Sequence, residues 1–143
     1  MLGMFESKNK KLVKKWKKDH ENLVIIGQKV IAEYVKNNES EARRQLKKFV
    51  DQAMDHLTSE DIEFYRMLND SENKDPRTEE LIEEFQRTFK DTKTTLMKFL
   101  AKYVRPETPL DDEFFDTFQK IMEILAKRIK FEEDNLYFRL SLS

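Results

Sequence analysis

Hydrophobic residues recur at steps of three and four along most of this chain, the spacing that gathers them on one face of an α-helix. Leu46, Phe49 and Ala53, for example, share one such face. The pattern predicts four long amphipathic helices, over residues 8–36, 41–68, 78–104 and 111–140. Short polar connections separate these segments, and Ser40 is a suitable cap for the second helix.

Four helices of this length, joined by short connections, predict an all-α fold in which they pack as one up-down-up-down antiparallel four-helix bundle. The composition agrees, because the 143 residues include 38% charged residues, 2 glycines and 3 prolines, which favours helices over a sheet. No internal repeat divides the sequence. We therefore expect a single domain over residues 1–143.

The composition also excludes several classes of site. The chain has no cysteine, so disulfides, thiolate metal ligands and thiol nucleophiles are absent. Its longest apolar run, residues 23–26, is too short to span a membrane, and lysines interrupt any signal-peptide pattern near the N-terminus. We expect a cytoplasmic protein without membrane contacts, present as a monomer or weak homodimer.

The charge of the chain is balanced overall but uneven along the sequence. A net charge of −1 argues against nucleic acid as a partner. Lysines nevertheless crowd the start of the first helix, and the candidate partner-binding residues there are Lys10, Lys14, Lys17 and Lys18. They would suit an acidic protein partner. The alternative is that these lysines form an ordinary solvated helix face.

Polar residues stand on two of the apolar helix faces. His56 and Glu60 lie one helical turn apart, on the same face as Leu46 and Phe49. His20, the other of the two histidines, lies on the apolar face of the first helix. A buried polar group without a partner costs roughly 1–3 kcal/mol. These side chains therefore need either a metal ion or hydrogen-bonded partners, and the pattern alone allows both.

The last helix adds Arg128, Glu132 and Glu133 to the candidates, whereas the third helix has Phe85 and Phe89 at its equivalent inner positions. Histidine and carboxylate ligands together suit iron, manganese or zinc. Arg128 would repel a metal ion, and the alternative is that it forms an ion pair with Glu60, Glu132 or both. The sequence shows no nucleophile arrangement and no glycine-rich phosphate loop, so we do not expect an enzyme.

Three segments resemble the motifs of hemerythrin-like (HHE cation-binding) domains, in the right order along nearly the whole chain. They are WKKDHENL at residues 16–23, HLTSEDIEFY at 56–65 and RIKFEEDNLY at 128–137. The first resembles the histidine segment of the family's first helix. The second resembles its H-x3-E motif, and the third resembles a last-helix segment that usually reads H-I-x-x-E-E-x-x-L-Y.

The resemblance implies a four-helix bundle with a non-haem di-iron centre that binds oxygen, handles nitric oxide or senses iron and redox state. His20, His56 and Glu60 would be ligands, with Glu60 bridging two metals, and Glu133 would take the place of the last-helix bridging carboxylate. Two departures stand out. Arg128 replaces the last-helix histidine, and the third-helix histidines have no counterpart, with Phe85 and Phe89 nearby. We therefore expect an incomplete centre, with one iron, two, or none.

A weaker resemblance links the chain to the Rsd/AlgQ regulators, which bind the principal sigma factor of RNA polymerase. Residues 12–16, 55–65 and 128–133 can be aligned with those proteins, although their G-H-F segment is replaced here by residues 60–62. Two hypotheses follow. In the first, a metal bound by His20, His56, Glu60 and Glu132 or Glu133 serves sensing, storage or regulation. In the second, a metal-free bundle binds a partner protein.

Overall fold

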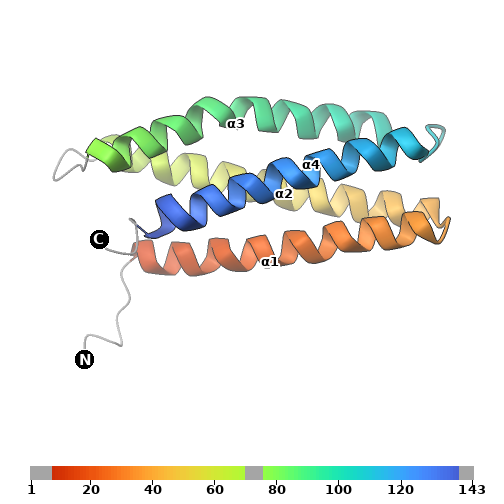
Figure 1. The fold of residues 1–143 in the computed structure, drawn as a ribbon, viewed down its shortest axis with the longest axis horizontal. Helices are drawn as coiled ribbons and strands as arrows, with labels where there is room; N and C mark the ends of the chain where they lie inside the picture. Colours follow the sequence, from red (N-terminus) through yellow and green to blue (C-terminus); the bar gives the residue numbers. More distant parts are fainter. Residues whose placement is uncertain (1–7, 70–75, 139–143) are drawn as a thin grey trace.

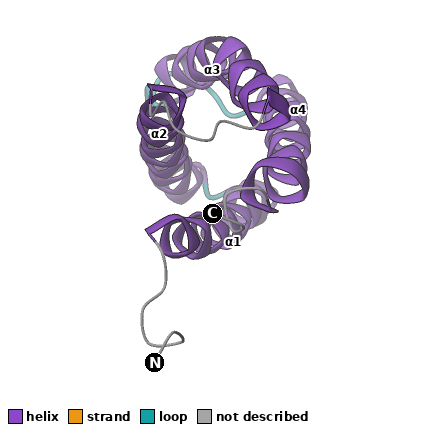
Figure 2. Ribbon diagram, turned by 90° about the vertical axis from the view of Figure 1, so that its left-hand side faces the viewer, coloured by secondary structure: helices purple, strands orange, loops and turns teal. Residues whose placement is uncertain are grey.

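The computed structural model describes residues 8–69 and 76–138, and within these ranges it contains helices and no strand. The elements are α1 (Lys8–Val35), α2 (Glu39–Asn69), α3 (Pro76–Tyr103), α4 (Asp112–Phe131) and a π-helical segment, η2 (Glu132–Tyr137). Consecutive helices run in opposite directions (Figure 1) and follow one another around a common core (Figure 2). The predicted all-α, up-down-up-down four-helix bundle is confirmed.

Two asparagines make the connection between α1 and α2. Asn37 adopts a left-handed backbone conformation with φ of 62°, and the Asn38 N–H donates to the Glu33 carbonyl at 2.9 Å, as in a Schellman motif. The Asn38 side chain then accepts a hydrogen bond from the Glu41 N–H at 3.3 Å. The predicted cap at Ser40 is therefore wrong, because α2 begins one residue before it.

The other helix starts follow simple local chemistry. α3 begins at Pro76, and proline suits a first helical position because that residue's N–H would have no partner within the helix. The helix thus starts two residues before the predicted position. Asp111 caps α4, since its Oδ1 atom accepts a hydrogen bond from the Phe114 N–H at 3.0 Å.

The last predicted helix changes its geometry partway. The α-helical part ends at Phe131, and the next six residues, Glu132–Tyr137, form a π-helix. Residues 139 and 140, at the end of the predicted range 111–140, lie outside the described residues. Single π-helical turns inside α-helices are rare and occur frequently at functional sites, and this one carries Glu132.

Two apolar clusters fill the bundle, one toward each end. The larger contains the stacked and edge-on rings of Phe49, Phe99, Phe114 and Phe118. The smaller consists of Val13, Trp16, Phe64, Leu81, Ile82, Phe85, Leu136 and Tyr137. Four buried polar residues, His20, His56, Glu60 and Glu132, lie where the two clusters meet, so the fold places a polar layer in the middle of its core.

Arg43 joins the start of α2 to the connection between α3 and α4. Its guanidinium donates to the carbonyls of Tyr103, Arg105 and Thr108, at 3.0, 2.8 and 2.5 Å. It also pairs with Glu39 at 3.1 Å. A largely buried cation thereby satisfies the carbonyl of the last residue of α3 and binds two carbonyls of the connection that follows it.

The outer faces of the helices carry many charged side chains, together with exposed apolar ones such as Ile25, Ile62 and Ile124. The lysines that the sequence suggested for partner binding are all exposed on α1, namely Lys10, Lys14, Lys17 and Lys18. Among the helices described, none is both long and apolar enough to cross a membrane.

Candidate metal centre

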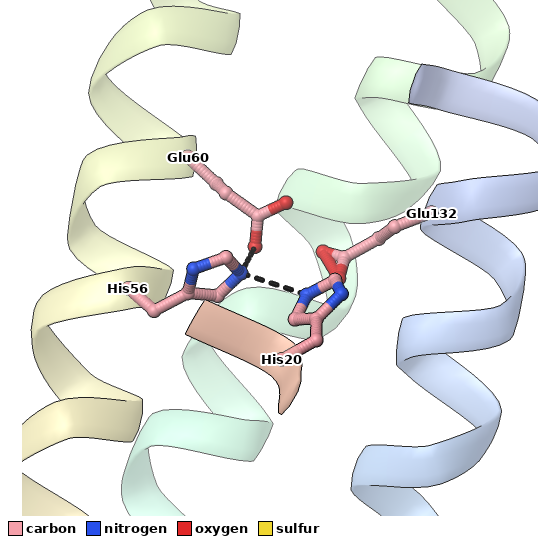
Figure 3. Close-up of side chains that lie close together, drawn as sticks. All are labelled: His20, His56, Glu60 and Glu132. Atoms are coloured by element: carbon pink, nitrogen blue, oxygen red, sulfur yellow. Dashed lines mark hydrogen bonds and ion pairs between the residues drawn. The ribbon is translucent and has the colours of Figure 1, made fainter. Parts of the chain in front are cut away.

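Four buried polar residues from three segments meet in the core. They are His20 of α1, His56 and Glu60 of α2, and Glu132 of η2 (Figure 3). Each offers one potential ligand atom, and these atoms lie within 4.8 Å of one another. None of the four residues is more than 6% exposed. The structure thus brings together four of the five residues that the sequence suggested as ligands.

The contacts within this group are short. The Nε2 atoms of His20 and His56 lie 2.9 Å apart, and Glu60 Oε1 lies 2.8 Å from His56 Nε2. Glu132 Oε1 lies 3.4 Å from His20 Nε2. Neighbouring ligand atoms around an ion with bonds of about 2.1 Å are themselves about 3 Å apart. The spacing of these atoms therefore fits a single bound metal ion.

Carboxylates hold the other nitrogen of each imidazole. Glu133 Oε2 lies 2.9 Å from His20 Nδ1, and Asp19 Oδ2 lies 3.0 Å from His56 Nδ1. A carboxylate at Nδ1 keeps the ring proton there and leaves a lone pair at Nε2, as is usual for histidines that bind metals. Glu133 consequently lies behind the His20 ring, while Glu132 faces the centre.

Two polar atoms in the group, Glu60 Oε1 and Glu132 Oε2, lack hydrogen-bond partners among the described residues. Glu60 Oε1 is close to His56 Nε2, yet no hydrogen bond forms if the His56 ring carries its proton at Nδ1, as its contact with Asp19 favours. Buried acceptors that face one another in this way are stabilised by a cation. The donor set therefore fits a metal ion.

Burial shifts the protonation of both carboxyl groups. It is the main cause that raises the pKa of Glu60 to about 7. For Glu132, burial followed by the charge of Glu60 raises the pKa to about 8. Two neighbouring carboxylates cannot both be charged cheaply in an apolar core. A metal ion would let both ionise, because its charge balances theirs.

Tyr137 closes one side of the group. Its hydroxyl donates to Glu60 Oε2 at 2.7 Å and lies 3.3 Å from His20 Nε2. Burial, followed by the charges of Glu60 and Glu132, raises the pKa of this phenol far above its usual value. In the absence of a cation, Tyr137 is therefore a neutral hydrogen-bond donor.

Arg128 lies beside the group and pairs with Glu132, as one of the sequence hypotheses suggested. Its Nε atom is 3.9 Å from Glu132 Oε2, while its other nitrogens donate to Thr88 Oγ1 at 2.7 Å and to the Phe85 carbonyl at 3.4 Å. The guanidinium also stacks over the Phe85 ring at 4.2 Å. These contacts hold a positive charge at the edge of the centre.

α3 supplies packing at this level. Phe85 is buried and meets the ring of Phe64 edge-on, with ring centroids 4.8 Å apart, and Phe89 is partly buried against both apolar clusters. All residues of α3 are described, and none of them belongs to the four-residue group. The centre is thus built by α1, α2 and η2.

An apolar cavity of about 60 Å³ lies next to the centre, between α1, α2 and α4. His20, His56 and Glu132 form its polar side, and Leu23, Ala53 and Leu125 are among its apolar walls. Met122 also lines it and packs on Gly27, where an added Cβ atom would lie 2.5 Å from the Met122 Cε atom. The cavity leaves space beside the ligand atoms for water or another small molecule.

Two residues of the site were not predicted. Asp19 directly precedes His20, but its position toward the outer face of α1 gave no reason to place it next to His56. Tyr137 was part of a quoted motif, yet an ordinary helix would turn it away from Glu132. No sequence pattern indicates the role of Asp19, because its partner His56 is 37 residues away along the chain.

The family model described as Hemerythrin HHE cation binding domain matches residues 11–140 of this chain. No curated protein and no solved structure shows significant similarity to it. The match covers most of α1 and all of α2, α3 and α4, and it includes His20, His56, Glu60 and Glu132. The chain therefore belongs to the hemerythrin HHE cation-binding domain family.

Proposed function

We propose that this chain binds one non-haem metal ion, with iron as the first choice, through His20, His56, Glu60 and Glu132. The observation that carries the proposal is the pair of imidazole Nε2 atoms 2.9 Å apart, each ring held by a carboxylate at Nδ1. Two imidazoles and two carboxylates suit iron, manganese or zinc. This site fits a role in sensing, storage or regulation better than it fits catalytic turnover.

The residues around the group favour one metal over two. α3 has Phe85 and Phe89 at this level, and the charge of Arg128 lies next to Glu132. A second cation near Glu132 would be repelled by this guanidinium. We therefore propose that the di-iron centre typical of such domains is reduced here to a mononuclear one.

Bound iron would supply reversible one-electron chemistry and an affinity for small ligands. The chain's own residues have other tasks in this proposal. Asp19 and Glu133 orient the two imidazoles, while Trp16, which is fully buried and edge-on to His56, helps to exclude water. Arg128 partly balances the charge of the two carboxylates. The apolar cavity limits what can reach the ion to small molecules.

Anaerobic titration with Fe²⁺, followed by elemental analysis after desalting, tests this proposal. We expect about one iron per wild-type chain and none for His56→Ala. Asp55→Ala is a matched control, because Asp55 is exposed and adjacent to His56 in α2; it should bind like the wild type. Equal iron content in wild type and His56→Ala would contradict the proposed site.

A second candidate function is a metal-free module that binds a partner protein. Arg128 favours it, because a cation already lies near Glu132 without any metal ion. The exposed lysines Lys10, Lys14, Lys17 and Lys18 would then contact an acidic surface, for example on a sigma factor. Calorimetry with purified principal sigma factor, using wild type and a variant with these lysines changed to glutamate, distinguishes this role from metal binding.

A further inference from the structure

The hydroxyl of Tyr137 lies among the ligand atoms of the proposed metal site. Asp19 and Glu133, which orient the histidines, contact the Nδ1 atoms and so lie behind the rings. Tyr137 Oη instead lies 3.3 Å from His20 Nε2, the nitrogen that faces the centre. It is also 2.7 Å from Glu60 Oε2. Both distances are close to the separation of neighbouring ligands around one ion, about 3 Å.

The π-helical turn of η2 explains how Tyr137 reaches this position. Tyr137 follows Glu132 by five residues, and in an α-helix two such residues point about 140° apart. In a π-helix the repeating hydrogen bond joins residues five apart, so the two side chains emerge on nearly the same side. The rare geometry of Glu132–Tyr137 therefore brings a carboxylate and a phenol to one centre.

Neighbouring rings hold Tyr137 in place. It stacks on His20 with an angle of 11° between the ring planes and centroids 5.6 Å apart. On another side it contacts Trp16, at a centroid distance of 5.5 Å. Both neighbours are buried, so the phenol oxygen has little freedom to move away from the centre.

We propose that Tyr137 is a fifth ligand of this centre and that its phenolate oxygen gives the site a preference for a trivalent ion, such as Fe³⁺, over a divalent one. The inference rests on the proposed metal-binding function. When the ion binds, the phenol O–H bond breaks, an Oη–metal bond forms, and the proton is released, as happens when protonated ligands bind metals.

The charge of the ligand set supports a trivalent ion. Glu60, Glu132 and a Tyr137 phenolate would contribute three negative charges, and the two imidazoles are neutral. Asp19 and Glu133, behind the imidazoles, add two negative charges, and Arg128 adds one positive charge. A trivalent ion therefore leaves less uncompensated negative charge around this centre than a divalent ion does. Uncompensated buried charge is costly, so the difference favours Fe³⁺.

The test is to load the protein with ferric iron, delivered as its nitrilotriacetate chelate, and to record visible absorption and resonance Raman spectra. A phenolate bound to Fe³⁺ gives a visible charge-transfer band and enhanced tyrosinate vibrations. We expect both signals in the wild type and their loss in Tyr137→Phe, with at least about tenfold weaker Fe³⁺ binding. Tyr103→Phe is the matched control, because Tyr103 is equally buried in the other apolar cluster.

Zn²⁺ binding is measured as well, as a control for correct folding of the Tyr137→Phe variant. Zn²⁺ bound equally by wild type and Tyr137→Phe shows that the variant folds. Iron bound by the wild type without tyrosinate vibrations, or a band that persists in Tyr137→Phe, overturns the inference and leaves the proposed metal site standing. Failure of the wild type to bind either metal instead refutes the proposed function, and the inference with it.

Discussion

His20 and His56 face each other across the core with their Nε2 atoms 2.9 Å apart, while a carboxylate holds the Nδ1 atom behind each ring. This arrangement directs two lone pairs toward one point. Glu60 and Glu132 add carboxylate oxygens at the same point. If the two histidines formed only a hydrogen-bonded pair in the core, one of these carboxylates would be sufficient as their partner. The presence of both carboxylates indicates a site for a cation.

Asp19 should be important for metal affinity although it is not a ligand. Asp19→Asn weakens the hold on His56 Nδ1, and loss of such an outer partner typically lowers affinity about 10–100-fold. Competition with a chromophoric chelator measures the change, and Asp55→Asn is the control. If both variants bind equally well, Asp19 does not orient His56.

Arg128 should oppose metal binding. Arg128→Met removes a positive charge next to Glu132 and keeps most of the side chain that covers Phe85. Because like charges a few ångströms apart repel by several kcal/mol even in a partly polar environment, we expect metal affinity to rise about tenfold or more. Arg87→Met, at an exposed position of α3, serves as control. Weaker binding by Arg128→Met would show that the guanidinium supports the site.

The metal-free protein should lose stability as the pH rises. Glu60 and Glu132 have pKa values of about 7 and about 8 when folded, against 4.5 as the usual value. A raised carboxyl pKa stabilises the fold fully below the unfolded value, and this contribution disappears as pH passes the folded values.

Urea unfolding in the presence of a chelator, at pH 5 and pH 8, measures this effect. We compare the wild type with a Glu60→Gln, Glu132→Gln double variant. Relative to this variant, the wild type should lose on the order of 5 kcal/mol of unfolding free energy between the two conditions. The double variant is the reference because it lacks both titrating groups. Parallel behaviour of the two proteins would mean that the carboxyl groups titrate normally.

Arg43 should contribute strongly to stability without touching the metal centre. Arg43→Met leaves the carbonyls of Tyr103, Arg105 and Thr108 without their donor, which should cost at least about 2 kcal/mol. Arg44→Met is the control, because Arg44 is exposed and forms only a surface pair, worth less than about 1 kcal/mol. Thermal unfolding of the metal-free proteins gives the comparison. Similar losses in both variants would contradict the role of Arg43.

The sequence was sufficient to predict the bundle because helical periodicity is a local property. It also indicated His20, His56 and Glu60, since polar residues on an apolar stripe stand out. The cap of α2 was missed because Asn38 and Ser40 are both suitable cap residues, and only the left-handed Asn37 places the start of α2 at Glu39.

The last helix shows where prediction from sequence ends. Glu132 and Glu133 are neighbours, and periodicity alone could not say which one faces the centre and which lies behind His20. In the structure Glu132 and Tyr137 share a π-helical segment, and their partners in α1 and α2 are far away in the sequence, so no local pattern reveals this arrangement. The same geometry brings Tyr137 into the site.

Anomalous diffraction from crystals loaded with Mn²⁺ or iron locates a bound ion directly. We expect one peak per chain, within about 2.2 Å of both the His20 and the His56 Nε2 atoms. Crystals of His56→Ala treated in the same way should show none. Two peaks per chain, a peak elsewhere, or no peak in the wild type would contradict a mononuclear centre at these residues.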